Sequence, residues 1–445
     1  MLGRRALETK GGRLTAFSLL YLSEGIPFGF SAIALVAYLR QSGVGLTEIG
    51  LFTGSLYLPW SFKWAWGPLV DLVKLQRFGP RRFWIVISQI MMIVTLGVVM
   101  AFDPGANLKL LTLLIVIHNV FASMQDVAID ALAVEVLPEH ERGLANGFMF
   151  GASYLGQAVG GSGALWMSAK FGFSATYPFV CGMLALILVF VTLRLHEPRA
   201  VVEAAEEKIV GLGAALRAVG WRIVKYLYDL YLSFFRAGPG PLVGVIVGLM
   251  PIGAVALGLG LGSTMQVDLG MTEGQIANLN IWTTVAAAIG CVAGGWISDR
   301  IGHRRMLAVW YALTTIPTFI LARQFTGLSG MEGVTIPFYW KIAVAYSLTS
   351  GLISGTSMAV YMGLTAPIVA ATQFTGYMAL KNFVYSYSSA WQGKYADTHG
   401  YASTLFLDGW IAFLPILLFP FLLPSRLGRQ EPEGVFPAPP DGGTP

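Results

Sequence analysis

Charged side chains are scarce in this chain. Asp, Glu, Lys and Arg make up only 12% of its 445 residues, whereas 55% of the residues are hydrophobic. In a typical soluble domain about a quarter of the residues are charged. The composition, with a mean hydropathy of +0.65, therefore excludes a soluble globular protein and indicates a protein that crosses the membrane several times.

Cysteine is also scarce, and the common sequence motifs of catalytic, metal-binding and phosphate-binding sites are absent. The two cysteines, Cys181 and Cys291, lie inside apolar runs, which excludes a disulfide framework. The sequence has no paired His and Cys spacing for a metal, no Gly-x-Ser-x-Gly turn for a nucleophile, and no phosphate-binding Gly-x-x-x-x-Gly-Lys-Ser/Thr loop. We therefore expect no enzyme activity, no metal, no cofactor and no use of ATP.

Long apolar runs dominate what is present. About 20 residues are needed to cross a hydrocarbon core of about 30 Å, and the sequence accommodates twelve such spans, at 14–39, 47–70, 83–102, 109–134, 143–169, 175–195, 241–265, 274–298, 305–324, 338–363, 370–396 and 402–423. This pattern predicts an all-α membrane protein with twelve transmembrane helices. They form two six-helix halves, residues 1–196 and 241–424, joined by a linker at 197–240 and followed by a disordered tail at 425–445.

Cations are distributed unevenly between the two sides of this topology. With the N-terminus in the cytoplasm, few of the 29 Lys and Arg residues lie in outer loops, namely Arg40, Lys109, Lys170, Arg323 and Lys394. The positive-inside rule therefore predicts a multi-pass protein of the inner membrane with both termini in the cytoplasm. The net charge of +5 follows from this bias, so no nucleic-acid partner is expected.

The linker changes from acidic to basic and aromatic along its length. Its second part places Arg217, Arg222 and Lys225 among Trp221 and several tyrosines. Basic residues beside aromatic ones are typical of a helix that lies in the membrane interface. A plain connector is the alternative interpretation.

One charged sequence motif occurs twice, 228 positions apart. Gly67-Pro-Leu-Val-Asp71 is followed by Gly79-Pro-Arg81-Arg82, and Gly295-Trp-Ile-Ser-Asp299-Arg300 is followed by Gly302-His-Arg304-Arg305. Each copy lies between the second and third span of its half, and a duplicated hairpin indicates a duplicated half. Two six-helix halves with this hairpin resemble the major facilitator superfamily. The first copy departs from the family pattern by five extra residues between its Asp and its second Gly.

The resemblance implies a transporter with gating elements in the two hairpins. In that family the motif stabilises the outward-open state, because its acid and its arginines pair across the inner gate. Gate and folding roles are therefore implied for Asp71, Arg81, Arg82, Asp299, Arg300, Arg304 and Arg305. The motif leaves the substrate open.

Phrases in the first half narrow the resemblance. Glu24-Gly-Ile-Pro-Phe-Gly29, Leu58-Pro-Trp-Ser-Phe-Lys63-Trp and Gln125-Asp126-Val-Ala-Ile-Asp130 are similar to a branch that contains AmpG-like muropeptide permeases, acetyl-CoA transporters and some siderophore importers. The segment Gln373-Phe-Thr-Gly-Tyr-Met-Ala-Leu-Lys381 adds a weaker match. Substrates differ within this branch, so the resemblance narrows the choice of cargo without making it.

Charges inside the predicted spans are the candidates for transport chemistry. Glu24, Lys63, Asp126 and Lys381 each lie within a span, and at 1.5 Å per residue all four are roughly 12 to 17 Å from its inner end. A charge at the bilayer centre costs at least about 2.5 to 3.5 kcal/mol, so such residues are functional candidates. Substrate sites of such transporters lie near this depth, between the two halves.

Two of these four residues are lysines, and of the two acids Glu24 is the preferred proton carrier. Lys63 and Lys381 are interpreted as contacts for an anionic substrate, one from each half, although Lys63 could instead snorkel or pair. Glu24 is interpreted as the proton carrier. The alternative is a static ion pair between Glu24 and Lys63.

Asp126 and Asp130 share a helical face because they are four residues apart. Asp126 either binds a proton or belongs to a gate network. Asp130, one turn nearer the cytoplasm, is interpreted as the gate partner of Arg81 or Arg82. Further polar residues are candidates for lining the substrate cavity: Tyr154, Gln157, Trp282, Tyr361, Asn382 and Tyr385.

These observations lead to one functional hypothesis. We expect a proton-coupled secondary transporter, an importer and symporter that works by alternating access, embedded as a monomer in the lipid bilayer. Its substrate is an amphiphilic, anionic organic solute such as an anhydro-muropeptide, a siderophore or an acyl-CoA-like molecule. The alternatives are a drug or metabolite exporter that works by proton antiport and, more remotely, a sensor with a transporter fold.

Overall fold

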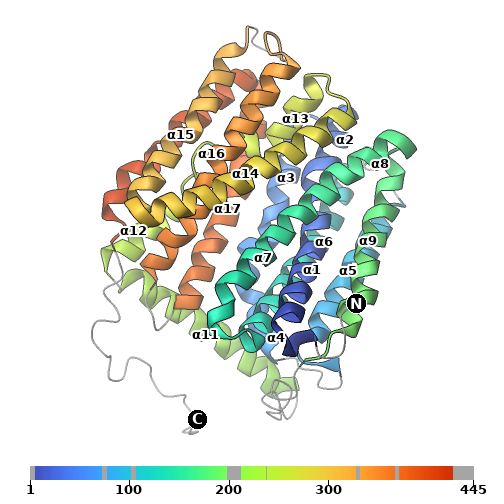
Figure 1. Cartoon of the computed structure of the whole chain (residues 1–445), viewed down its shortest axis with the longest axis vertical. Helices are drawn as coiled ribbons and strands as arrows, with labels where there is room; N and C mark the ends of the chain where they lie inside the picture. The colour runs from blue at the N-terminus through green and yellow to red at the C-terminus, as the bar shows by residue number, and fades with distance from the viewer. Residues whose placement is uncertain are drawn as a thin grey trace.

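The computed structural model describes residues 6–72, 78–101, 107–197, 212–236, 238–326, 331–365 and 370–423. Every regular element in these ranges is a helix (Figure 1). Seven helical runs within them are long and apolar enough to cross a membrane, and the last of these, Gln373–Phe421, holds two predicted spans. The chain turns between those two spans at Gly400, whose φ of 78° is a backbone conformation that glycine adopts without steric strain.

The first half follows the six predicted spans. Its first span is α1 (Lys10–Gly29), a π-helical turn η2 (Phe30–Ala34) and α2 (Leu35–Gln41), and the turn begins three residues after Pro27, which supplies no backbone N–H. The second span is broken by a short 3₁₀ turn, and the fifth contains a second π-helical turn. The elements are α3 (Leu46–Ser61), η3 (Lys63–Ala65), α4 (Trp66–Leu72), α5 (Arg82–Val99), α6 (Leu108–Val136), α7 (Glu139–Ala158), η5 (Val159–Gly163), α8 (Ala164–Phe171) and α9 (Thr176–Phe190).

The second half supplies the other six spans. Its first span is broken: α12 (Pro239–Gly248) and α13 (Gly260–Asp268) are separated by irregular chain that contains the short turn η8 (Ala256–Gly258). The remaining elements are α14 (Glu273–Ile301), α15 (His303–Gln324), α16 (Ile336–Leu364), α17 (Ala370–Ile411) and η10 (Leu414–Phe421). Figure 1 shows the blue-to-green helices of the first half beside the yellow-to-red helices of the second. The predicted twelve-helix architecture in two halves is confirmed.

The linker contains the helix α11 (Leu212–Phe235). It contacts α4 of the first half and α12 and α17 of the second, and Figure 1 shows it lying beneath the spans. Trp221, Val224, Tyr228 and Tyr231 are 44% to 55% exposed and follow one another at helical spacing. This exposed apolar stripe suits a helix at the membrane surface, and that location stays a prediction. The boundaries of the two halves and of the linker also stay predictions. The predicted disordered tail lies outside the described residues.

Glycines set the closest crossings between helices. A Cβ atom on Gly160 would lie 1.7 Å from the carbonyl oxygen of Ile26, and one on Gly290 would lie 2.1 Å from that of Leu348. The backbones of η5 and α1, and those of α14 and α16, are therefore in direct contact. Such crossings hold each half together without large side chains at the seam.

The crossing of α1 and η5 predicts a sharp difference between two glycine variants. Gly160→Ala should destabilise the protein by roughly 1–3 kcal/mol, because the added methyl overlaps a backbone oxygen that cannot easily move. Gly97→Ala is the matched control, since nothing lies within 4 Å of its Cβ position. Thermal unfolding of the two variants in detergent measures the difference, and equal melting temperatures would contradict the tight crossing.

Candidate functional site

A cluster of charged side chains lies inside the first half. The Lys63 ammonium is 3.1 Å from Asp126 Oδ2 and 3.9 Å from Asp130 Oδ2, and the Tyr21 hydroxyl donates to Asp130 Oδ1. The helix α3 ends before Lys63, which therefore stands on the turn η3 opposite the two acids of α6. The Lys63 and Asp126 side chains are only 17% and 8% exposed, so theirs is a buried ion pair. Among the described residues no group of His, Cys, Asp and Glu is placed to hold a metal.

Glu24 lies one turn along α1 from Tyr21. Its carboxylate accepts a hydrogen bond from Trp60, while its Oε2 is buried and has no hydrogen-bond partner in the described structure. Lys63, the cation that the sequence offered as a static partner, is paired with Asp126 instead. Glu24 is therefore a buried carboxylate without a cation of its own, which is a costly state while it is charged.

Aromatic rings connect the first half to the second. Trp60 and Tyr57 both pack edge-on against Phe28, with ring centroids 5.8 and 5.5 Å from it. On the other side, the ring of Tyr57 lies 5.3 Å from that of Tyr385 on α17, and the Lys381 ammonium lies 5.9 Å from the Tyr385 ring. We call this row of rings the aromatic bridge: Trp60, Phe28, Tyr57 and Tyr385. It has Glu24 at one end and Lys381 at the other.

The other predicted cavity residues do not all lie near the aromatic bridge. Tyr361 is 3% exposed and stacks on Tyr377 with centroids 4.9 Å apart, so it packs within the core of the second half. Trp282 is 56% exposed, and its ring packs against that of Trp340 on α16. Other apolar residues of α14 are exposed as well. Such an apolar stripe is typical of a lipid-facing surface. A cavity-lining role for Tyr361 and Trp282 stays a prediction.

Three candidates remain open. Tyr154 on α7 is 38% exposed. The backbone of Gln157 packs against Gly29 of α1, and its side chain is half-buried. Asn382 is half-buried next to Lys381. A substrate-binding role for these three residues stays a prediction.

The first gate hairpin is tied to its own half. Arg81 donates to Glu135 Oε1 from Nε and Nη2, at 3.1 and 2.8 Å. Glu197 accepts hydrogen bonds from the backbone N–H groups of Arg81 and Arg82, at 2.9 and 2.6 Å, and so caps α5. Burial raises the pKa of Glu197. The side chain of Asp71 lies outside the described residues.

Asp130 has a different partner from the one expected. The sequence predicts Arg81 or Arg82 as its gate partner, whereas the structure shows it in contact with Lys63 and Tyr21. Arg81 pairs with Glu135, which lies five residues further along α6 and so about 7 Å nearer the inner end. Asp130 therefore belongs with Asp126 and Lys63.

The second gate hairpin also forms its contacts within its own half. Asp299 Oδ1 is 2.8 Å from His303 Nε2, and the Arg300 guanidinium lies 3.6 Å above the Trp296 ring. Arg304 and Arg305 line a pocket at the beginning of α15. The contacts described for Arg81, Asp299 and Arg300 thus lie within their own halves. A gate role for the hairpin residues stays a prediction.

At the opposite end of the molecule, contacts join the two halves. Arg40, at the end of α2, binds Asp268, at the end of α13, through two hydrogen bonds of 2.6 Å, and Tyr401 donates to the same carboxylate at 2.6 Å. Two flanking pairs link hydroxyls to carboxylates: Thr47 donates to Asp397 at 2.8 Å, and Ser168 donates to Glu273 at 2.9 Å. We call this set the outer seal: Arg40, Asp268, Tyr401, Thr47, Asp397, Ser168 and Glu273.

The outer seal has the symmetry of the duplicated sequence. Arg40 and Asp268 are 228 residues apart, which is the interval between the two gate hairpins, so they occupy equivalent positions in the two halves. From the sequence Arg40 is expected only to be a cation of an outer loop, and its pairing with Asp268 is not predicted. Opposite charges at equivalent positions near a symmetry axis were the available signal.

Asp408 is a second residue that the sequence analysis missed. It is fully buried, and its carboxylate accepts hydrogen bonds from the Ala256 N–H at 3.1 Å and from Gln392 at 2.8 Å. Ala256 begins the turn η8, so Asp408 satisfies backbone that the broken span would leave unpaired inside the membrane. The rule that selected Glu24 would also have selected Asp408, which lies within the predicted span 402–423.

The buried pair predicts a rescue between two substitutions. Lys63→Met should destabilise the protein by about 3–5 kcal/mol, because it leaves Asp126 buried without its cation. The double variant Lys63→Met with Asp126→Asn should recover most of that loss. Thermal unfolding of both single variants and the double variant measures the coupling, and simple addition of the two single effects would contradict a direct pair.

Comparison with known proteins gives the family. The chain matches the family model described as Major Facilitator Superfamily over residues 17–250, just over half of its length. It is 25% identical over 418 residues to the anhydromuropeptide permease of Escherichia coli (strain K12), covering 90% of this chain and 77% of that protein. It is 23% identical to the putative transporter AmpG 4 of Rickettsia felis, covering 93% and 95%.

Solved structures give the same fold. The structure resembles the xylose transporter XylE from E. coli in its inward-open conformation, with a TM-score of 0.67 and 15% identity, over 94% of this chain and 98% of that one. Family match, relatives and fold agree with twelve spans in two halves. This chain belongs to the Major Facilitator Superfamily and is a multi-pass membrane transporter.

Proposed function

We propose that this protein is a proton-coupled importer of an anionic glycopeptide of the anhydromuropeptide class. It works by alternating access in an inner membrane, with both termini in the cytoplasm. The observation that carries the proposal is the aromatic bridge, which spans the two halves between the uncompensated carboxylate of Glu24 and the ammonium of Lys381. A relative that aligns with 90% of the chain is named anhydromuropeptide permease, which supports the cargo class.

The aromatic bridge and Lys381 suit a cargo with sugar rings and carboxylates. Sugar rings pack on aromatic faces, and a peptide carboxylate needs a cation when it leaves water. No ion pair of Lys381 is found among the described residues, whereas Lys63 is held by Asp126. Lys381 therefore takes the leading role in binding the anion, and Lys63 is reserved for the proton cluster.

The proton cluster has more acids than bases. Glu24, Asp126 and Asp130 act on one another electrostatically, and Lys63 is the cation among them. A surplus of carboxylates in a poorly solvated place favours uptake of a proton. Glu24 is the carrier in this proposal, because Asp126 and Asp130 are each held by a partner and one oxygen of Glu24 is not.

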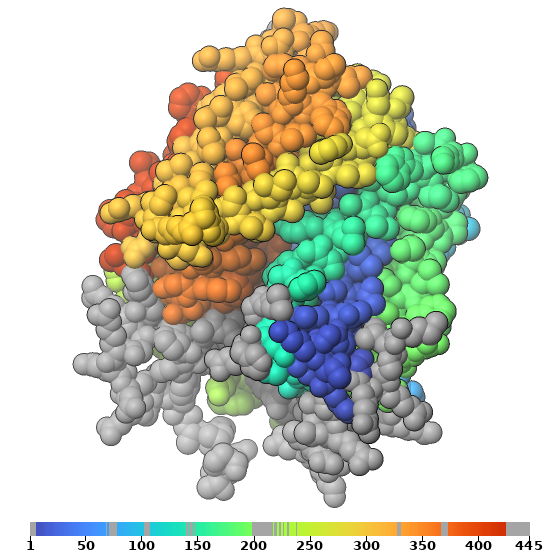
Figure 2. Space-filling model, viewed as in Figure 1, coloured from blue at the N-terminus to red at the C-terminus, as the bar shows by residue number. Residues whose placement is uncertain are grey.

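Alternating access follows from the outer seal. With the seal formed, the substrate path is closed at the end that carries Arg40 and Asp268. Figure 2 shows α8 in blue-green and α14 in yellow meeting near that end, while α7 and α14 diverge away from it. Opening outward requires the seal to break and the gate hairpins to approach. Protons moving inward with the cargo make the direction import.

Glu24→Gln should abolish uptake against a gradient while exchange of cargo across the membrane persists. The amide keeps the shape and the hydrogen bond from Trp60 but cannot carry a proton. Proteoliposomes with an imposed pH gradient measure accumulation, and counterflow with preloaded cargo measures exchange. The control is Glu48→Gln on the exposed start of α3; equal loss of both activities in the Glu24 variant would favour a structural role instead.

Asp268→Asn should shift the protein toward an outward-open state, because it weakens the contacts of Arg40 and Tyr401 together. Spin labels at Ser42 and Lys394, introduced after Cys181 and Cys291 are changed to serine, report the distance across the outer end. We expect a longer distance in the variant and no change in Glu332→Gln, an exposed outer acid. An unchanged distance in Asp268→Asn would show that the seal does not hold the outer end closed.

A further inference from the structure

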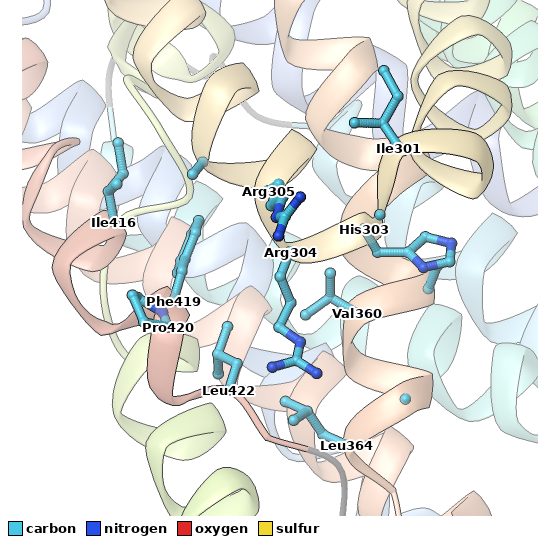
Figure 3. Close-up of a pocket in the computed structure, with 14 residues that line it drawn as sticks. Ile301, His303, Arg304, Arg305, Val360, Leu364, Ile416, Phe419, Pro420 and Leu422 are labelled. Carbon is cyan, nitrogen blue, oxygen red and sulfur yellow. The ribbon is translucent and has the colours of Figure 1, made fainter.

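A cavity of about 830 Å³ lies at the inner end of the second half, away from the aromatic bridge. It is bounded by the beginning of α15, the end of α16 and the turn η10 (Figure 3). These are the ends of membrane-spanning segments, so the cavity lies where the hydrocarbon core gives way to the lipid headgroups. Its volume is within the range of cavities that bind organic ligands.

The wall of this cavity is divided into a cationic and an apolar side. Arg304 and Arg305 form the cationic side, and Figure 3 shows the Arg304 guanidinium reaching between Leu364 and Leu422. The apolar side is built from the end of α16 and from η10, with Leu364, Ile416, Phe419, Pro420 and Leu422. A cavity of this kind matches a ligand that has both a charge and a hydrocarbon part.

The two arginines are available to such a ligand. Of the neighbouring charged groups, Asp299 is occupied by His303 at 2.8 Å, and Arg300 lies on the Trp296 ring. No ion pair of Arg304 or Arg305 is found among the described residues, although Arg304 is half-buried against apolar side chains. The first turn of α15 adds its positive dipole end on the same side. A half-buried guanidinium in this position is stabilised by an anion.

The planar guanidinium of arginine donates two parallel hydrogen bonds to phosphate as it does to carboxylate, and phosphate is the anion that phospholipid headgroups carry at this depth. We propose that this pocket binds an anionic phospholipid of the cytoplasmic leaflet. Its phosphate lies on Arg304 and Arg305, and the first part of an acyl chain packs against Phe419 and Leu422. Bound there, the lipid connects α15, α16 and η10 at the end of the second half. This gives the second gate hairpin a ligand of its own that is independent of the transported cargo.

The test uses the full chain in nanodiscs of phosphatidylcholine, with phosphatidylglycerol added in steps. Native mass spectrometry counts retained phosphatidylglycerol, and thermal unfolding measures its stabilising effect. We expect the affinity to fall by about tenfold to thirtyfold when Arg304→Gln and Arg305→Gln are combined, since each cation contributes separately. The control is Arg323→Gln, which removes a cation from the other end of the same helix and should leave retention unchanged.

Three outcomes would overturn the proposal. Equal retention in the double variant and the wild type would show that the arginines do not hold lipid. Equal stabilisation by inorganic phosphate and by phosphatidylglycerol in the wild type would identify a small-anion site instead. Lipid binding that develops only when the chain is ended at Leu423 would show that the segment after Leu423 fills the cavity in the intact protein.

Discussion

The cost of an unpaired charge inside a membrane governs how this transporter is built. Lys63 is balanced by Asp126 and Asp130, and Asp408 is held by a backbone N–H and a glutamine amide. Glu24 differs from these residues, because one of its oxygens is buried with no partner in the described structure. In the proposed mechanism this incomplete pairing is the place that takes up the proton. The aromatic bridge begins at this residue, so Trp60 and Phe28 connect the proposed proton site to the proposed cargo site.

The duplicated sequence gives the two ends of the molecule different electrostatics. At the outer end, equivalent positions have opposite charges, so Arg40 and Asp268 attract each other across the boundary between the halves. The flanking pairs also join the two halves, and in both of them a hydroxyl of the first half donates to a carboxylate of the second. Divergence of one residue in a duplicated pair is enough to turn a symmetric position into an interlocking contact.

Much of the fold could be predicted from the sequence, because apolar run length and the repeated hairpin are one-dimensional signals. The same signals located Glu24, Lys63, Asp126 and Lys381, but they gave only depth. Depth could not tell that Lys63 would pair with Asp126 rather than Glu24, or that Asp130 would contact Lys63 and Tyr21, since partners 63 residues apart meet only through helix packing. The position of Tyr361 illustrates a related limit: the apolar residues of α16 are not concentrated on one side, so its sequence does not indicate which face is buried.

At the inner end, both copies of the hairpin carry arginines. Because equivalent positions of the two halves have the same charge there, they repel each other and oppose closure of the inner end. Arg81 and Arg304 cannot attract each other, so each hairpin depends on an anion of another origin. The first copy finds one within the protein, because Glu135 of α6 binds Arg81. In the second copy Asp299 is occupied by His303, which leaves Arg304 and Arg305 facing the apolar cavity beside η10. Like charges at the inner end and opposite charges at the outer end both favour the closed outer seal. Opening outward therefore needs an added source of free energy, and binding of an anionic cargo together with a proton between the halves can supply it only if both bind more tightly in the outward state.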